Sequence, residues 1–229
     1  MSITIVQSAF NPAFHAGSGT ATVTLTNPVT SGNAVLIGFA GNDSQTAKTV
    51  GTITDDKSNT GYSTLTFDNT APVDGQGWFI LTNVTNGPST FDVPFTTSSA
   101  ANIIIGVYEI SGLLASPGDF ANTLTSGFST TFNLAITTTV ANELGFAILS
   151  NSNGSGQTAV TLTNGWTADF TDLTGSTFFS VFAHMALPTA GSGNSIQGST
   201  ASADEWNVSI VSLKPSTTAA NTAPIAWIT

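Results

Sequence analysis

The chain has 229 residues, of which 13 are Asp or Glu and 3 are Lys or Arg, so its net charge is −10. Charged residues make up 7% of it, against about a quarter of an average soluble domain. With so few cations to pair with phosphates, the chain is a poor candidate for binding nucleic acid or an anionic membrane. The absence of cysteine excludes disulfides, thiol nucleophiles and thiolate metal sites.

The composition is nevertheless that of a folded protein. Hydrophobic residues supply 40% of the chain, including 15 Phe and 4 Trp, and the mean hydropathy is +0.22. Disordered chains have lower hydrophobicity and higher charge. Nearly half of the residues are Ser, Thr, Gly or Asn, and Thr favours strands while Asn and Gly favour tight turns. We therefore expect an all-β fold.

Alternation of apolar and polar residues recurs along the chain without a sustained helical period, and turn clusters such as Asn164-Gly165 separate the alternating runs. This pattern of short strands, with turn signals every 8–12 residues or so, is typical of a sandwich or barrel. The predicted strands are residues 3–7, 20–26, 34–40, 50–54, 62–67, 77–84, 90–95, 103–111, 130–137, 144–150, 159–163, 167–170, 178–185, 195–198 and 206–213.

Between the eighth and ninth strands we expect a packed crossover loop at residues 113–124, with one short helical turn at residues 116–122. We expect one domain over residues 1–214 and a C-terminal extension over residues 215–229 with an apolar end. The first ten residues lack the basic segment and apolar run of a signal peptide, and no stretch of about 20 apolar residues is present to span a bilayer. We therefore expect synthesis and folding in the cytosol.

The two halves of the chain resemble each other. Four pairs of segments match in order: residues 32–36 with 141–144, 61–64 with 165–168, 78–79 with 178–179, and 104–111 with 205–212. Chance matches in a Thr- and Gly-rich chain are the alternative explanation. We predict a single antiparallel β-sandwich of jelly-roll type with pseudo-duplicated halves, in which each half gives strands to both sheets.

The densest polar cluster, Asp55, Asp56 and Asn59, falls in a predicted hairpin loop. Two adjacent carboxylates and an amide are a weak candidate site for a hard cation such as calcium, but the spacing does not match an EF-hand loop. Asp and Asn are also the residues that tight turns use for side-chain to backbone hydrogen bonds. We favour the turn and predict no metal and no cofactor.

Other ionisable residues give no catalytic set. We expect Glu109 and Glu143 to accept backbone N–H groups from a neighbouring loop rather than to act as acids or bases. Asp169 and Asp172 are predicted to be strand-end or loop residues, and Asp204 and Glu205 to place charge at a strand end. A catalytic triad needs Ser, His and Asp to converge, and Ser is too abundant for any one to stand out as a partner of His15 or His184, so we predict a non-enzymatic protein.

Aromatic and apolar side chains offer two candidate binding sites. Trp166 follows a turn and is the best candidate for an exposed ring that stacks on a sugar, although most Trp residues are core residues. The C-terminal residues Ile225, Ala226, Trp227 and Ile228 form an apolar end that we expect to bind a neighbouring subunit. A tail folded back on its own sandwich, or a disordered one, is the alternative.

Four segments carry a resemblance to a known class of module: residues 30–37, residues 53–56 before Tyr62, residues 107–113 and residues 138–144. Together they resemble a recurrent β-sandwich module of phage virion proteins and of some bacterial surface proteins, over about residues 3–214. The chain departs from that pattern at residues 58–62, where a Gly-Asn-x-Tyr turn is expected. The resemblance implies a display or interaction scaffold without catalytic residues.

We therefore expect a structural phage protein, made in the host cytoplasm and located in the virion, with capsid decoration as its first role. Its expected partners are the major capsid protein or other virion proteins, and a homo-oligomer is expected. The alternative is a carbohydrate- or receptor-binding module of a tail fibre or of a bacterial surface. A glycan-cleaving enzyme is the third possibility, and it would need two carboxylates roughly 5–10 Å apart.

Overall fold

The computed structural model describes residues 2–15, 17–42, 48–68, 75–97, 101–125, 128–151, 157–173 and 178–216. Within these ranges every regular element is a strand and every strand pairing is antiparallel, so the all-β prediction is confirmed. The same ranges contain no helix with the length and apolar character needed to cross a membrane.

The described residues form 17 strands. They are β1 (Thr4–His15), β2 (Gly19–Thr24), β3 (Ala34–Asn42), β4 (Thr49–Val50), β5 (Thr54–Asp55), β6 (Ser63–Asp68), β7 (Gly75–Leu81), β8 (Thr90–Thr96), β9 (Ala101–Ser111), β10 (Leu113–Thr125), β11 (Ser129–Thr138), β12 (Glu143–Asn151), β13 (Val160–Leu162), β14 (Thr167–Asp172), β15 (Ser180–Leu187), β16 (Gly191–Asp204) and β17 (Trp206–Pro215).

The crossover loop predicted at residues 113–124 and its helical turn at residues 116–122 are wrong. These residues form β10, which pairs with β17. The register shifts between Leu113 and Gly118, so Pro117 lies in the irregular part of the strand. A proline is tolerated there because its missing N–H removes no regular ladder bond.

The two halves of the chain have the same strand order. Residues 4–111 form a first inner sheet, β1-β9-β3-β7-β6, and a first outer sheet, β2-β8-β4, with β5 also paired to β8. Residues 113–215 form a second inner sheet, β10-β17-β12-β15-β14, and a second outer sheet, β11-β16-β13. Each strand of the first half thus has its counterpart in the second, β1 in β10 and β9 in β17, with β13 in the place of β4 and β5.

The prediction of antiparallel sheets packed as a β-sandwich is confirmed, but the expectation that each half gives strands to shared sheets is wrong. Among the described strands no pairing joins one half to the other, so each half forms its own sandwich. The duplication itself is present in the strand order. The finer jelly-roll class stays a prediction.

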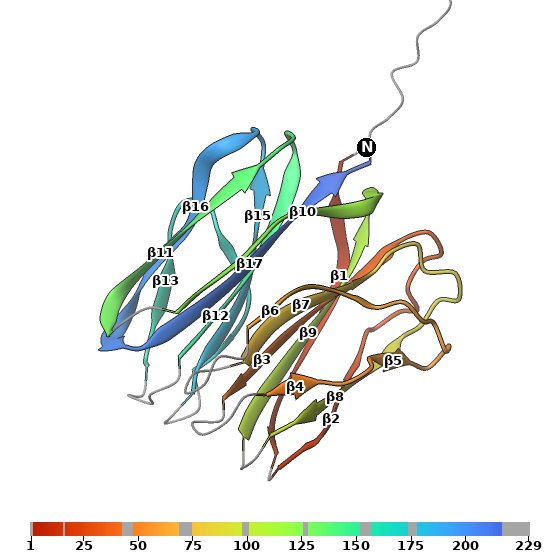
Figure 1. The fold of residues 1–229 in the computed structure, drawn as a ribbon, viewed down its shortest axis with the longest axis horizontal. Coiled ribbons are helices and arrows are strands. Elements are labelled where there is room, and N and C mark those ends of the chain that lie inside the picture. The colour runs from red at the N-terminus through yellow and green to blue at the C-terminus, as the bar shows by residue number, and fades with distance from the viewer. Residues whose placement is uncertain are drawn as a thin grey trace, which may run out of the picture.

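The four sheets stack as layers around three apolar cores (Figure 1). One core lies between the sheets of the first half and another between the sheets of the second half. The third joins the two inner sheets, where Leu36 and Trp78 of the first half pack with Phe146 and Phe182 of the second. The inner sheets are therefore covered on both faces, and the outer sheets form the two ends of the stack.

Two glycines form a recess that positions the halves against each other. Gly38 on β3 is paired with Gly106 on β9. A Cβ atom at Gly38 would lie 2.7 Å from the ring of Phe182, and one at Gly106 would lie 2.9 Å from it. The rings of Phe10 and Trp78 flank Phe182, with centroids 5.5 and 6.1 Å away. We call this arrangement the glycine recess.

The halves are joined through Gly112, the one residue between β9 and β10. Its φ of 79° is in the left-handed region that favours glycine, and a Cβ there would collide with the carbonyl oxygen of Ser2. The N–H of Ser216 donates to the carbonyl of Gly112 at 2.7 Å. Residues near both ends of the described chain therefore meet its midpoint.

Candidate functional site

The loop after β5 is built around the carboxylate of Asp55. Its Oδ1 accepts the N–H groups of Lys57 and Asn59 at 2.9 and 3.1 Å, and its Oδ2 accepts the hydroxyl of Tyr62 at 2.6 Å. Burial raises the pKa of the Tyr62 hydroxyl, and the hydrogen bond to Asp55 raises it further. The carboxylate of Asp55 thus fixes the conformation of residues 55–62 by bonding to donors within that loop.

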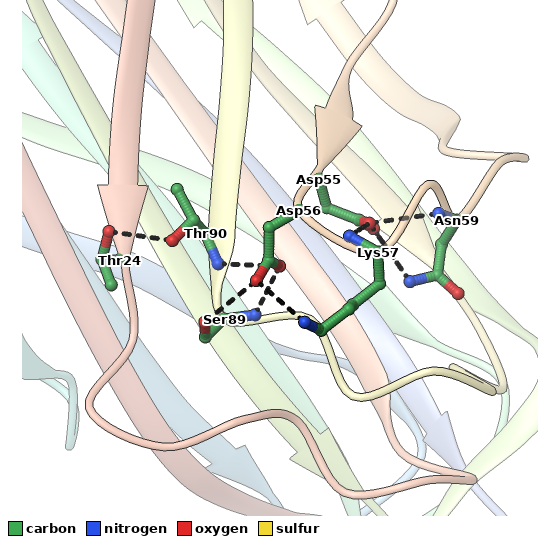
Figure 2. A network of polar contacts seen from close by, with 7 residues as sticks. All are labelled: Thr24, Asp55, Asp56, Lys57, Asn59, Ser89 and Thr90. Atoms are coloured by element: carbon green, nitrogen blue, oxygen red, sulfur yellow. Dashed lines mark hydrogen bonds and ion pairs between the residues drawn. The ribbon is translucent and has the colours of Figure 1, made fainter.

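The neighbouring carboxylate of Asp56 points to a different segment (Figure 2). Its Oδ1 accepts the N–H groups of Ser89 and Thr90 at 2.9 and 3.2 Å, at the start of β8. Lys57 Nζ lies 3.6 Å from its other oxygen. Burial opposes ionisation, but the hydrogen bonds from Ser89 and Thr90 outweigh it and lower the pKa of Asp56.

These are the bonds that the turn interpretation predicts. The oxygens of Asp55 and Asp56 are directed at separate sets of donors, and Asn59 donates its own amide to Asp55. Among the residues that the structure describes, no group of three or more His, Cys, Asp or Glu side chains could hold a metal ion. The weak metal candidates Asp55, Asp56 and Asn59 therefore form a hydrogen-bonded loop.

Glu109 holds the loop between β2 and β3, as predicted. Its side chain is buried, and its carboxylate accepts Thr30 N–H at 2.8 Å, Asn33 Nδ2 at 2.6 Å and Gln7 Nε2 at 2.6 Å. Burial opposes ionisation, but the hydrogen bonds from Gln7, Thr30 and Asn33 outweigh it and lower the pKa of Glu109. The hydrogen bonds of this carboxylate therefore hold the loop between β2 and β3 against β1 and β9.

We predict that Glu109→Gln loses about 1–3 kcal/mol of the free energy of unfolding at pH 7, because one carboxylate acceptor becomes an amide donor that faces Gln7. The folded-state pKa of Glu109 lies below its ordinary value of 4.5. The stabilisation is therefore complete above pH 4.5 and is lost as the pH falls through the lowered pKa. Urea unfolding from pH 7 to pH 3 should show the two proteins converging; a constant difference would contradict this role.

The second half stabilises the corresponding loop with a different set of residues. Glu143 accepts the N–H of Val140 at 3.2 Å, and Asp119 accepts the N–H of Thr139 at 2.5 Å and Lys214 Nζ at 3.2 Å. Burial and the adjacent Asp119 raise the pKa of Glu143. Burial also opposes ionisation of Asp119, but hydrogen bonds from Glu143 and Thr139 lower its pKa.

A polar trio, Tyr108, Asp169 and His184, links the two inner sheets. The Tyr108 hydroxyl on β9 donates to Asp169 Oδ2 on β14 at 3.0 Å, and His184 Nδ1 on β15 lies 2.6 Å from Asp169 Oδ1. Burial raises the pKa of Tyr108, and the charge of Asp169 raises it further. Asp169 was expected at a strand end, but it lies within β14 at a bulge between Ala168 and Phe170. It therefore connects the halves.

The other half provides an internal comparison for this trio. Leu36 is paired with Ile80 and Tyr108, and its counterpart Phe146 is paired with His184 and Val211. The bulge of β6 falls at Leu65, as the bulge of β14 falls at Asp169. The positions equivalent to the trio are thus Leu65, Ile80 and Val211, which all belong to the apolar core between the inner sheets. The fold itself does not require polar side chains here.

Trp166 is not an exposed platform, and that expectation is wrong. Its side chain is 7% exposed, packs in the core of the second half, and donates Nε1–H to the carbonyl of Ser195 at 2.9 Å. The preceding Asn164 and Gly165 have φ values of 58° and 84°, and the tight turn that they form leads directly to this buried ring. A buried ring whose N–H is already bonded offers no face to a sugar.

The second outer sheet, by contrast, presents an uncharged face. The one ionisable residue in β11, β13 and β16 is Asp204, which is fully buried and accepts the N–H of Glu205 at 2.8 Å. Asp204 is the last residue of β16, at a strand end as was expected, but its side chain is buried and is not presented at the surface. The outward-facing side chains here are those of Ser, Thr, Asn, Gln and Ala. This face was not predicted, although the sequence has a long run without Asp, Glu, Lys or Arg from residue 178 to residue 203, in which His184 is the one ionisable residue.

Ile225, Ala226, Trp227 and Ile228 lie outside the described residues, so the subunit-docking role expected of them stays a prediction. Comparison of the chain with models of protein families, with curated proteins and with solved structures finds no match.

Proposed function

We propose that this chain is a non-enzymatic structural protein of a phage particle, made in the host cytoplasm, and that it decorates the capsid. The observation that carries the proposal is the chemistry of the two outer sheets. The second outer sheet has no exposed ionisable side chain, and the strands of the first contain only Asp55 and Asp92. Asp55 is bonded within its loop, and Asp92 accepts the hydroxyl of Thr22 at 2.5 Å.

Surfaces of this kind suit contact with other proteins. Charged residues are depleted at the centres of protein interfaces, because an ion that loses its water must be paired. Hydroxyl and amide groups can exchange water for a partner at little cost. The layered stack presents two such faces on opposite sides, so one copy can contact two neighbours, and symmetry multiplies modest contacts over a shell. The partners are then the major capsid protein, other virion proteins or further copies of this chain.

Imaging of purified particles of the source phage by electron cryomicroscopy tests this role. Decoration predicts density of this two-sandwich shape at symmetry-related positions on the capsid. Density confined to the tail fibres would favour the receptor-binding alternative, and particles without the protein would contradict a virion role.

The C-terminal extension gives a second test of the same role. We predict that a chain ending at residue 216 occupies fewer capsid positions than the full chain, because the apolar segment from Ile225 to Ile228 is lost while the sandwiches remain. The occupancy is measured on particles assembled with each protein, and circular dichroism confirms that the truncated chain is folded. A full-length control that carries Trp227→Ser and Ile228→Ser should behave like the truncation. Equal occupancy of all three proteins would contradict the docking role.

A further inference from the structure

A groove of about 450 Å³ lies on the second outer sheet, which is within the size range of small-molecule sites. It follows β16 at Gly198 and is bordered by residues of β11 and by the residue after β13. Its polar lining comes from Thr131, Asn133, Thr163, Gln197 and Ser199, and its aromatic lining from Phe132 and Trp206.

Glycine at position 198 gives the groove its aromatic component. A Cβ there would collide with the ring of Phe132 and with the carbonyl oxygen of Thr161, so no side chain fits. The equivalent strand of the first half, β8, has Phe91, Val93 and Phe95 at its core-facing positions instead. The ring of Phe132 thus lies against β16, and Trp206 packs edge-on against it with centroids 5.4 Å apart.

The indole N–H of Trp206 has no hydrogen-bond partner among the residues that the structure describes, although the residue is only 3% exposed. A buried donor without an acceptor costs free energy, and such groups mark sites of missing water or ligand. Trp206 lines the groove, but its Nε1 is itself buried, so an occupant would have to displace part of the lining to offer this N–H an acceptor oxygen. This orphaned donor distinguishes the groove from an ordinary depression in a sheet.

We propose that this groove binds a neutral saccharide. Hydroxyl and amide side chains match the alternating donors and acceptors of a sugar ring, and aromatic carbons match its C–H faces. Among the described residues that line the groove there is no lysine, arginine or histidine, so no cation there would pair with a phosphate, sulfate or carboxylate. The groove is distinct from Trp166, whose ring lies in the core. It lies on the second outer sheet, so it is open to a sugar in copies of the protein whose second outer sheet is not covered by a neighbour.

The full chain is first screened on an array that contains neutral and acidic glycans. The best neutral oligosaccharide is then titrated into ¹⁵N-labelled protein, and the indole N–H resonance of Trp206, assigned with Trp206→Phe, is followed. We expect selective binding of neutral glycans and a saturable shift of this resonance. Binding of acidic glycans only, or of no glycan, would overturn the proposal.

A matched pair of variants locates the site. Asn133→Ala combined with Gln197→Ala removes two outward amides from the groove and should weaken binding by about tenfold or more, the loss expected for one or two hydrogen bonds. Thr22→Ala combined with Thr24→Ala removes two outward side chains from β2 of the first outer sheet and should leave the affinity unchanged. Thermal melting confirms that both variants are folded. Equal affinities for the two variants would place the sugar elsewhere and overturn the assignment.

Discussion

Phe182→Ala is expected to lower the free energy of unfolding by about 3–5 kcal/mol, the usual cost of removing a large buried ring. Phe182 is completely buried and lies in the glycine recess, between the two inner sheets. Its loss would leave a cavity lined by Phe10 and Trp78 of the first inner sheet. Chemical denaturation measures the change. Phe128→Ala is the matched control, because Phe128 is 71% exposed and its loss should cost less than about 0.5 kcal/mol.

Filling the glycine recess, rather than emptying it, is a second test of its packing. Gly106→Val places a side chain where the rings of Phe10 and Phe182 now lie, so it should cost about 1–3 kcal/mol or more through overpacking. In the double variant with Phe182→Ala the new side chain enters the vacated space. The double variant should therefore be more stable than the sum of the single effects predicts. Strict additivity would mean that ring and glycine do not share this space.

The second large effect is expected at the polar trio. Asp169→Ala removes the acceptor of the buried Tyr108 hydroxyl and of His184 Nδ1, and should cost about 2–3 kcal/mol. Most of this loss comes from Tyr108, because its side chain is completely buried while that of His184 is 29% exposed. Chemical denaturation again measures the change. A loss within experimental error would show that water replaces the carboxylate without cost.

A triple variant, with Tyr108→Phe, Asp169→Leu and His184→Ile, separates the cost of broken bonds from any benefit of the intact trio. It reproduces the apolar character of Leu65, Ile80 and Val211 at the equivalent place in the other half. Replacing a complete buried polar network by apolar residues is often neutral or stabilising, whereas removing one member is costly. We therefore expect the triple variant to be more stable than Asp169→Ala. The opposite order would indicate that the site cannot be packed with apolar residues.

Most of the strands could be predicted from the sequence, because alternation is a local property. Residues 113–124 were misassigned because Pro117 and Gly118 interrupt the alternation, and only the pairing with β17 makes this segment a strand. The division into inner and outer sheets is also marked along the chain, by the difference between largely apolar strands and alternating strands. β7 and β9 are almost continuously buried, whereas β2 and β11 alternate between buried and exposed residues. Continuous burial marks a sheet covered on both faces.

The candidate sites were predictable only where they are local. Asp55, Asp56 and Asn59 lie within five residues of one another, so their turn could be read from spacing. Tyr108 and Asp169 are 61 residues apart and meet only because the inner sheets pack face to face. The direction of the Trp166 ring depends likewise on the core behind the turn. No sequence spacing encodes either contact.

Ser2, Gly112 and Ser216 meet at one corner of the molecule, and this determines how the protein would be oriented if it were attached to a larger assembly through either end. A tether attached beyond either end would leave the body at this same corner. β9 runs from there over 11 residues, a length of about 35 Å at the usual rise of a strand. The far ends of the inner strands, such as Asn42 on β3 and Ala101 on β9, would then lie roughly that distance from the anchor, and both sandwiches would be presented together.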